Sequence, residues 1–112
     1  MGKLIDIQGI ILGSFDNYKD SYSLSGTKMR YETLIANNGQ HFQLIRLGWY
    51  KGKRVYKIIA HLEIKTDKIW VQEDNTEEGI ATFLLDLGVD KSKIVLAYFS
   101  EGHRAHTDFA IG

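Results

Sequence analysis

Cysteine and proline are both absent from this 112-residue chain. Without cysteine the chain can have no disulfide framework, no thiol nucleophile and no cysteine-ligated zinc site. Without proline, no X-Pro isomerisation can slow folding. The lack of cysteine fits a reducing compartment, and we expect a cytoplasmic protein.

Net charge is missing as well, because 14 basic side chains balance 14 acidic ones. DNA affinity depends largely on lysine and arginine neutralising phosphates. A neutral chain can carry a local basic patch, but its overall charge gives no argument for nucleic acid. No apolar run approaches the length needed to span a bilayer, so we expect no membrane association. The length and the ordinary hydrophobic content of 44% predict one globular domain over residues 1–112.

Helical periodicity opens the chain and then gives way to strand periodicity. Residues 3–18 are predicted to form an amphipathic helix, because apolar side chains recur there at spacings of three and four. These are Leu4, Ile7, Ile11, Phe15 and Tyr18. After a polar segment, a period of two predicts strands over residues 29–35 and 41–50. Asn38-Gly39 between them is a strong signal for a hairpin.

The third predicted strand has the clearest alternation in the chain. We expect one face to hold Tyr56, Ile58, Ala60, Leu62 and Ile64. The other face would hold Lys57, His61, Glu63 and Lys65. A short fourth strand over residues 69–72 follows a turn, so the four strands form a predicted antiparallel meander.

A second helix is predicted after residue 76. Asp74, Asn75 and Thr76 can each cap it, and Asn75 with Glu78 would form a close relative of a capping box. Gly88 is placed to end this helix in the left-handed conformation. The run over residues 94–99 is typical of a strand buried on both faces. Residues 100–108 read as a polar loop, and residues 109–111 as a final short strand.

These elements predict an α+β fold, with two helices packed on an antiparallel β-meander of about four to six strands. The expected order is α-β-β-β-β-α-β, followed by the optional last strand.

Two short patterns invite a catalytic or metal-site hypothesis. Glu63-Ile64-Lys65 resembles the Glu-x-Lys signature of metal-dependent nucleases, in which the carboxylate holds Mg²⁺ and the lysine steadies the attacked phosphate. Simple alternation of a solvent-facing strand explains it better. The tail from His103 to Asp108 holds two histidines and an aspartate, but its spacing matches no strong ligand pattern. We predict no metal site, no cofactor and no catalytic residue.

Both tryptophans fall in predicted strands. Trp49 ends the second strand, and Trp70 shares a face with Gln72 in the fourth. If Ile69 and Val71 point to the core, Trp70 points away from it. An outward tryptophan fits a contact surface, or else a helix or the C-terminal segment covers that face. Both interpretations stay open. The predicted partner-binding residues are Trp49, Trp70, Gln72, His103, Arg104 and His106.

The stretch from Ile69 to Ala81 resembles the hallmark segment of the XisI-like family, the fdxN-element excision controlling factors of filamentous cyanobacteria. The strand that ends at Gly48-Trp49, the segment His61–Lys65 and the C-terminal Phe109–Gly112 are similar as well. The resemblance covers residues 41–112 well and the first helix loosely. Asp90, where the family usually has proline, and Asn75, where it usually has glycine, depart from the family pattern.

The resemblance implies a role in programmed excision of a DNA element during heterocyst differentiation. Together with the neutral charge and the lack of a catalytic constellation, it supports the hypothesis of a non-enzymatic accessory factor that binds a nuclease-like XisH partner and can associate with DNA indirectly through it. The family pattern carries no catalytic residue over to this chain. Two alternatives stay open: a metal-dependent phosphodiesterase using Glu63 and Lys65, and an accessory protein that binds DNA directly. We also expect self-association into a homo-oligomer, because a small sheet exposes edges and tryptophan-bearing faces.

Overall fold

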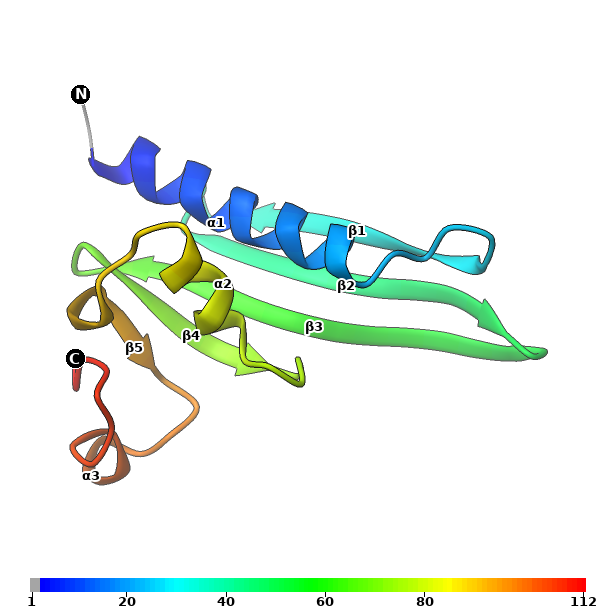
Figure 1. Ribbon diagram of the computed structural model, residues 1–112. Helices are drawn as coiled ribbons and strands as arrows, with labels where there is room; N and C mark the ends of the chain where they lie inside the picture. Colours follow the sequence, from blue (N-terminus) through cyan, green and yellow to red (C-terminus); the bar gives the residue numbers. More distant parts are fainter. Residues whose placement is uncertain (1–2) are drawn as a thin grey trace.

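The computed structural model describes the backbone of residues 3–112 and the side chains of residues 7–112. A long helix precedes five strands, and two short helices and a 3₁₀ turn complete the fold (Figure 1). The elements are α1 (Lys3–Ser21), β1 (Lys28–Ala36), β2 (His41–Tyr50), β3 (Lys53–Lys65), β4 (Lys68–Asp74), α2 (Ile80–Asp86), η1 (Lys91–Lys93), β5 (Ile94–Leu96) and α3 (Glu101–Arg104). The predicted α+β class and element order are confirmed. No helix of the described residues has the length and apolarity to cross a bilayer.

The strands form one sheet in the order β1-β2-β3-β4-β5. The first four strands pair antiparallel, as the predicted meander requires. Two-residue turns at Lys51-Gly52 and Thr66-Asp67 have positive φ at both positions, which suits the twist of tight hairpins. β5 pairs parallel to β4, because α2 carries the chain back across the sheet before β5 begins.

Both α1 and α2 pack on the same face of the sheet, which we call the inner face (Figure 1). The predicted stripe of α1 is confirmed where it is described: Ile11, Phe15 and Tyr18 are buried, and Ile7 packs against the core. The side chain of Leu4 lies outside the described residues. The main core forms where this stripe meets the buried side chains of β2, β3 and β4, and it includes Phe42, Leu44, Leu62 and Val71.

The predicted faces of the third strand are wrong in its first half. The pairing of β2 with β3 shifts between Leu44 and Ile45, which pair with Ala60 and Ile58 and leave Ile59 as the extra residue of a β-bulge. Ile59 is buried in the core, with 1% of its surface exposed. The bulge reverses the alternation, so Tyr56 and Ile58 lie on the outer face, opposite Ala60, Leu62 and Ile64.

The second helix begins later than its acidic residues predict. α2 starts at Ile80, whose amide donates to the Asp74 carboxylate at 2.9 Å, and Gly79 occupies the N-cap without a side-chain bond. The Asn75–Glu78 capping box is therefore wrong. Asn75 instead donates to the Ile58 carbonyl oxygen (2.8 Å), and Glu78 accepts from the Tyr22 hydroxyl (2.7 Å).

The C-terminal end of α2 is as predicted. Gly88 has φ 92°, and the Val89 amide reaches back to the Leu84 carbonyl oxygen (3.2 Å). β5 is shorter than the predicted strand and covers only Ile94–Leu96. The predicted loop over residues 100–108 contains the short helix α3. The predicted final strand is a single parallel bridge between Val95 and Ala110.

Candidate functional site

The second face of the sheet, which we call the outer face, carries the candidate site. Alternation along β2 turns His41, Gln43, Ile45, Leu47 and Trp49 away from the helices. The outer face has two parts. The proximal part consists of the outer side chains of residues 41–43, 61–63 and 70–72, and the C-terminal segment (residues 97–112) packs against Trp70 and β5 at its edge. The distal part consists of residues 28–32, 45–50 and 53–58. β2 and β3 continue there past the end of α1 (Figure 1).

Five polar side chains on the proximal part form a polar cluster that spans three strands. Its members are His41 and Gln43 on β2, His61 and Glu63 on β3, and Gln72 on β4. The His41 and His61 rings meet at 2.9 Å, Nδ1 to Nε2, and Gln43 Nε2 lies 3.2 Å from His61 Nδ1. Gln72 donates to Glu63 Oε1 at 2.9 Å, and His41 Nε2 lies 3.6 Å from Glu63 Oε2.

One arrangement of protons fits all of these contacts. If the Gln43 amide donates to His61 Nδ1, then His61 is neutral and carries its proton on Nε2. His61 then donates to His41 Nδ1, and His41 Nε2–H points towards Glu63. In this arrangement the cluster is a directed chain of donors that runs from Gln43 through His61 and His41 to Glu63, with the amide orientation and the tautomers assigned from the contacts.

The electrostatics of His61 favour the same neutral state. Burial lowers the pKa of His61 below its ordinary value, and the neighbouring His41 lowers it further. The carboxylates of Glu63 and Glu73 act in the opposite direction without reversing the shift. Protonation at His61 Nδ1 would also remove the acceptor that Gln43 uses. The contacts within the cluster can therefore fix the orientation of side chains from three strands.

Trp70 lies beside the cluster and is covered by the C-terminal segment. Its indole N–H donates to the Lys65 carbonyl oxygen at 2.9 Å. The Lys65 ammonium lies 4.5 Å from the ring centroid, the Arg104 guanidinium lies 5.6 Å from it, and Gly112 lies beside the ring. Of the two interpretations left open for the outward tryptophans, the covered one holds for Trp70.

The other residues of the tail have separate positions. His103 stacks on Phe99 with the rings parallel and 4.1 Å between centroids. His106 is exposed, and Asp108 lies 3.6 Å from the Lys91 ammonium. No group of three or more histidine or carboxylate side chains is placed to hold a metal among the described residues. Glu63 and Lys65 of the nuclease-like tripeptide are engaged by Gln72 and Trp70.

The structure therefore divides the six predicted contact residues. The proximal part holds Trp70 and Gln72 on β4. The C-terminal segment that packs beside it holds His103, Arg104 and His106. Trp49 lies apart on the distal part, with 51% of its surface exposed.

Sequence patterns alone did not indicate two sets of residues. One is His41 and Gln43, because cross-strand neighbours are visible only when the register is known. The other is the distal group around Tyr56 and Arg54. A readable signal existed for the second set, because residues 44–58 contain five basic side chains and no acidic one.

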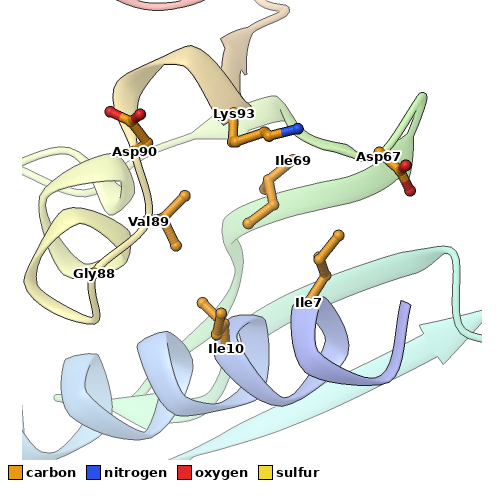
Figure 2. Close-up of a pocket in the computed structure, with 8 residues that line it drawn as sticks. All are labelled: Ile7, Ile10, Asp67, Ile69, Gly88, Val89, Asp90 and Lys93. Atoms are coloured by element: carbon orange, nitrogen blue, oxygen red, sulfur yellow. The ribbon is translucent and has the colours of Figure 1, made fainter. Parts of the chain in front are cut away.

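A pocket of about 330 Å³ opens on the helix side of the fold, between α1, β4 and the segment that follows α2 (Figure 2). Figure 2 shows Ile7, Ile10, Ile69 and Val89 pointing into the space. Charged side chains stand only at its rim: Asp67, Asp90 and Lys93. Such a lining favours apolar contact and places no convergent polar groups for chemistry.

Comparison with known proteins adds the family. Two solved structures from Anabaena variabilis match nearly the whole chain, each at 28% sequence identity. A XisI-like protein matches with a TM-score of 0.82, covering 97% of this chain and 99% of that one. The fdxN element excision controlling factor XisI matches with a TM-score of 0.76, covering 99% and 100%. The comparison with curated proteins found no match.

The family model described as XisI protein matches residues 1–111, which is nearly the full length. The resemblance inferred from the segments around Trp49, Trp70 and the C-terminus is thereby confirmed. The chain belongs to the XisI family.

Proposed function

We propose that this protein is a non-enzymatic accessory factor that controls excision of a DNA element by binding a nuclease-like XisH partner. The observation that carries the proposal is the family membership over residues 1–111, together with the similarity to a structure named as an excision controlling factor. The side-chain chemistry is consistent with this role. The side chains of the polar cluster bond to one another, and they offer structural organisation rather than an aligned nucleophile and base.

The C-terminal segment is the surface we assign to the partner. Tyr98 and Ile111 are large apolar side chains that remain exposed on it. Arg104 lies against Trp70, its Nε is buried without a hydrogen-bond acceptor, and no described carboxylate lies within ion-pair distance. Arginine beside exposed aromatic and aliphatic groups is typical of the residues that dominate protein interfaces. A carboxylate of the partner would complete the contacts of Arg104.

The test is co-expression with the XisH-like protein of the same genome, followed by purification through a tag on the partner. We expect a stoichiometric complex. Arg104→Glu should weaken it by about tenfold or more, because an unpaired charge would replace a charge-assisted contact. His106→Glu, on an exposed side chain of the same segment, serves as a second variant that leaves the packing on Trp70 intact. Lys93→Glu, outside the segment, is the matched control.

Two results would overturn the proposal. One is that the partner purifies without this chain at every protein concentration tried. The other is cleavage of DNA by this chain alone with Mg²⁺ or Mn²⁺, abolished by Glu63→Gln, since that would make the protein an enzyme.

A further inference from the structure

Charge is strongly segregated in this neutral chain. Residues 44–58 carry five basic side chains and no acidic one: Arg46, Lys51, Lys53, Arg54 and Lys57. Residues 73–90 carry six acidic side chains and no basic one. The first segment forms the distal ends of β2 and β3, and the second contains the end of β4 and all of α2. By the alternation of the two strands, Arg54 lies on the outer face, Arg46, Lys53 and Lys57 lie on the inner face, and Lys51 lies in the turn. The distal sheet is therefore basic on both faces, although the total charge is zero.

The register arranges the outer side of this basic surface into two rows. Lys28, Trp49 and Arg54 are cross-strand partners in one row, and Arg30, Leu47 and Tyr56 are partners in the next. Trp49 and Tyr56 are thus diagonal neighbours on adjacent strands, a relation that brings aromatic rings within reach of each other. They are 51% and 64% exposed. Each row offers an exposed aromatic ring, and the first row also offers the Lys28 cation on β1, whereas Arg30 in the second row is paired with Glu32.

A hollow of about 600 Å³ adjoins the first row. Trp49 and Tyr50 line it together with residues 26–28 and the turn at Lys51-Gly52. The Arg54 guanidinium lies 5.7 Å from the Trp49 ring, and the Lys51 ammonium lies 5.2 Å from the Tyr50 ring. Two aromatic rings, Trp49 and Tyr50, and two cations, Lys28 and Lys51, therefore line the same open hollow.

We propose that the distal outer face binds single-stranded nucleic acid. Two bases stack on Trp49 and Tyr56, and the phosphates lie along Lys28, Arg54 and Lys51 of the turn. Single-strand binding sites combine exposed aromatic platforms with a positive track for the backbone, and an open sheet face presents its rings in this way.

The pattern of charge decides between nucleic acid and an acidic protein surface. Glu32 is the only acidic residue on the three distal strand segments, and Arg30 already pairs with it at 2.9 Å. A surface that binds a protein would gain from carboxylates of its own, because these would pair with basic groups of the partner. Nucleic acid has one sign of charge along its backbone and flat faces between the charges, and this surface matches both properties.

The inference goes beyond the proposed partner contact, because it uses the other part of the outer face. Binding is measured by the fluorescence anisotropy of a labelled twelve-nucleotide oligo(dT) at a series of salt concentrations. The affinity should fall steeply with salt, by about 0.7 in the logarithm of the association constant per tenfold change for each phosphate neutralised. Duplex DNA of the same length should bind more weakly, because its bases are already stacked.

Variants locate the site. Trp49→Ala and Tyr56→Ala should each weaken binding by about tenfold with little change in the salt slope, as expected for the loss of one stacked base. Lys28→Glu with Arg54→Glu, two cations of the first row, should weaken binding and flatten the slope. Tyr98→Ala and Lys93→Glu are matched aromatic and charge controls on other surfaces, and both should bind as the wild type does.

Three outcomes would overturn the inference: no binding to oligo(dT) at about 50 mM salt, an equal loss in the matched controls, or equally effective competition by polyglutamate. Dimerisation that Trp49→Ala abolishes, without oligonucleotide binding, would assign this face to a second copy instead. The proposed partner contact fails separately. Arg104→Glu should leave oligonucleotide binding unchanged, and Trp49→Ala should leave co-purification with the XisH-like protein unchanged.

Discussion

The two halves of strand β3 both pair with β2, but they differ in their burial and in their other neighbours. The half from Ala60 to Lys65 buries alternate side chains under α1 and α2, whereas the half from Lys53 to Ile58 is largely exposed. The bulge at Ile59 marks the change. The two halves of the strand therefore have different structural roles. Burial of the inner face stabilises the proximal half, while the distal half extends the backbone ladder beyond the core and presents side chains to solvent.

The sharpest test of this comparison substitutes one residue in each half. Leu62→Ala removes a fully buried side chain, and we expect it to lower the free energy of unfolding by about 2–5 kcal/mol. Tyr56→Ala removes a larger side chain from the exposed half and should cost under about 0.5 kcal/mol. Urea denaturation followed by circular dichroism measures both. Similar losses for the two variants would show that the distal half also packs against something.

A second substitution asks whether the distal ladder needs its close backbone approach. Gly48 has φ 142°, and a Cβ at this position would overlap the Lys28 carbonyl oxygen and the Met29 Cα. Gly48→Ala should therefore cost about 1–3 kcal/mol in backbone strain and separate β1 from β2 locally. Hydrogen exchange should accelerate at residues 28–30 and stay unchanged in β4. Gly52→Ala, where a Cβ has open space, is the control for positive φ alone.

A third test concerns the start of α2, which packs over the proximal half of β3. Asp74 accepts hydrogen bonds from the Thr76 amide (3.0 Å), the Thr76 hydroxyl (2.6 Å) and the Ile80 amide (2.9 Å). Asp74→Ala should cost about 1–2 kcal/mol, because it leaves these donors without their acceptor. Thermal unfolding measures the loss. Asp86→Ala, at the other end of α2, is the matched removal of a carboxylate. Equal effects of the two substitutions would contradict the capping role of Asp74.

The smallest expected effect is a pH dependence from the polar cluster. The pKa of His61 is lowered from its ordinary value of 6.5, so the unfolded chain takes up a proton at a higher pH than the folded chain. The stability contributed by neutral His61 is fully present above pH 6.5 and is lost as the pH falls from there through the lowered folded pKa. His61→Gln should reduce the loss of stability between pH 7.5 and 5.5, measured by urea midpoints. His106→Gln should not change it.

Sequence patterns predicted the elements well and their faces less well. The helix stripe of Ile11, Phe15 and Tyr18 and the end of α2 at Gly88 were readable, because local spacing and backbone conformation decide them. The run Ile58-Ile59-Ala60 was not readable. Three consecutive apolar residues fit either alternation, and only pairing with β2 selects the bulge.

The candidate site shows the same division between local and tertiary information. That Trp70 points outward followed from alternation in its own strand. That Arg104 and Gly112 cover it depends on a segment more than 30 residues away. The helix cap failed for a related reason, because Asp74 bonds an amide six residues ahead across a turn instead of the third residue that local capping rules assume.

The separation of acidic residues 73–90 from basic residues 44–58 gives this protein two regions of opposite charge without a net charge. A charged molecule at long range therefore feels little attraction. Within about a Debye length, the region of opposite charge attracts it and the other region repels it. Anions are turned towards the strand tips and cations towards α2 (Figure 1). The orientation in which such a molecule approaches is therefore set before contact.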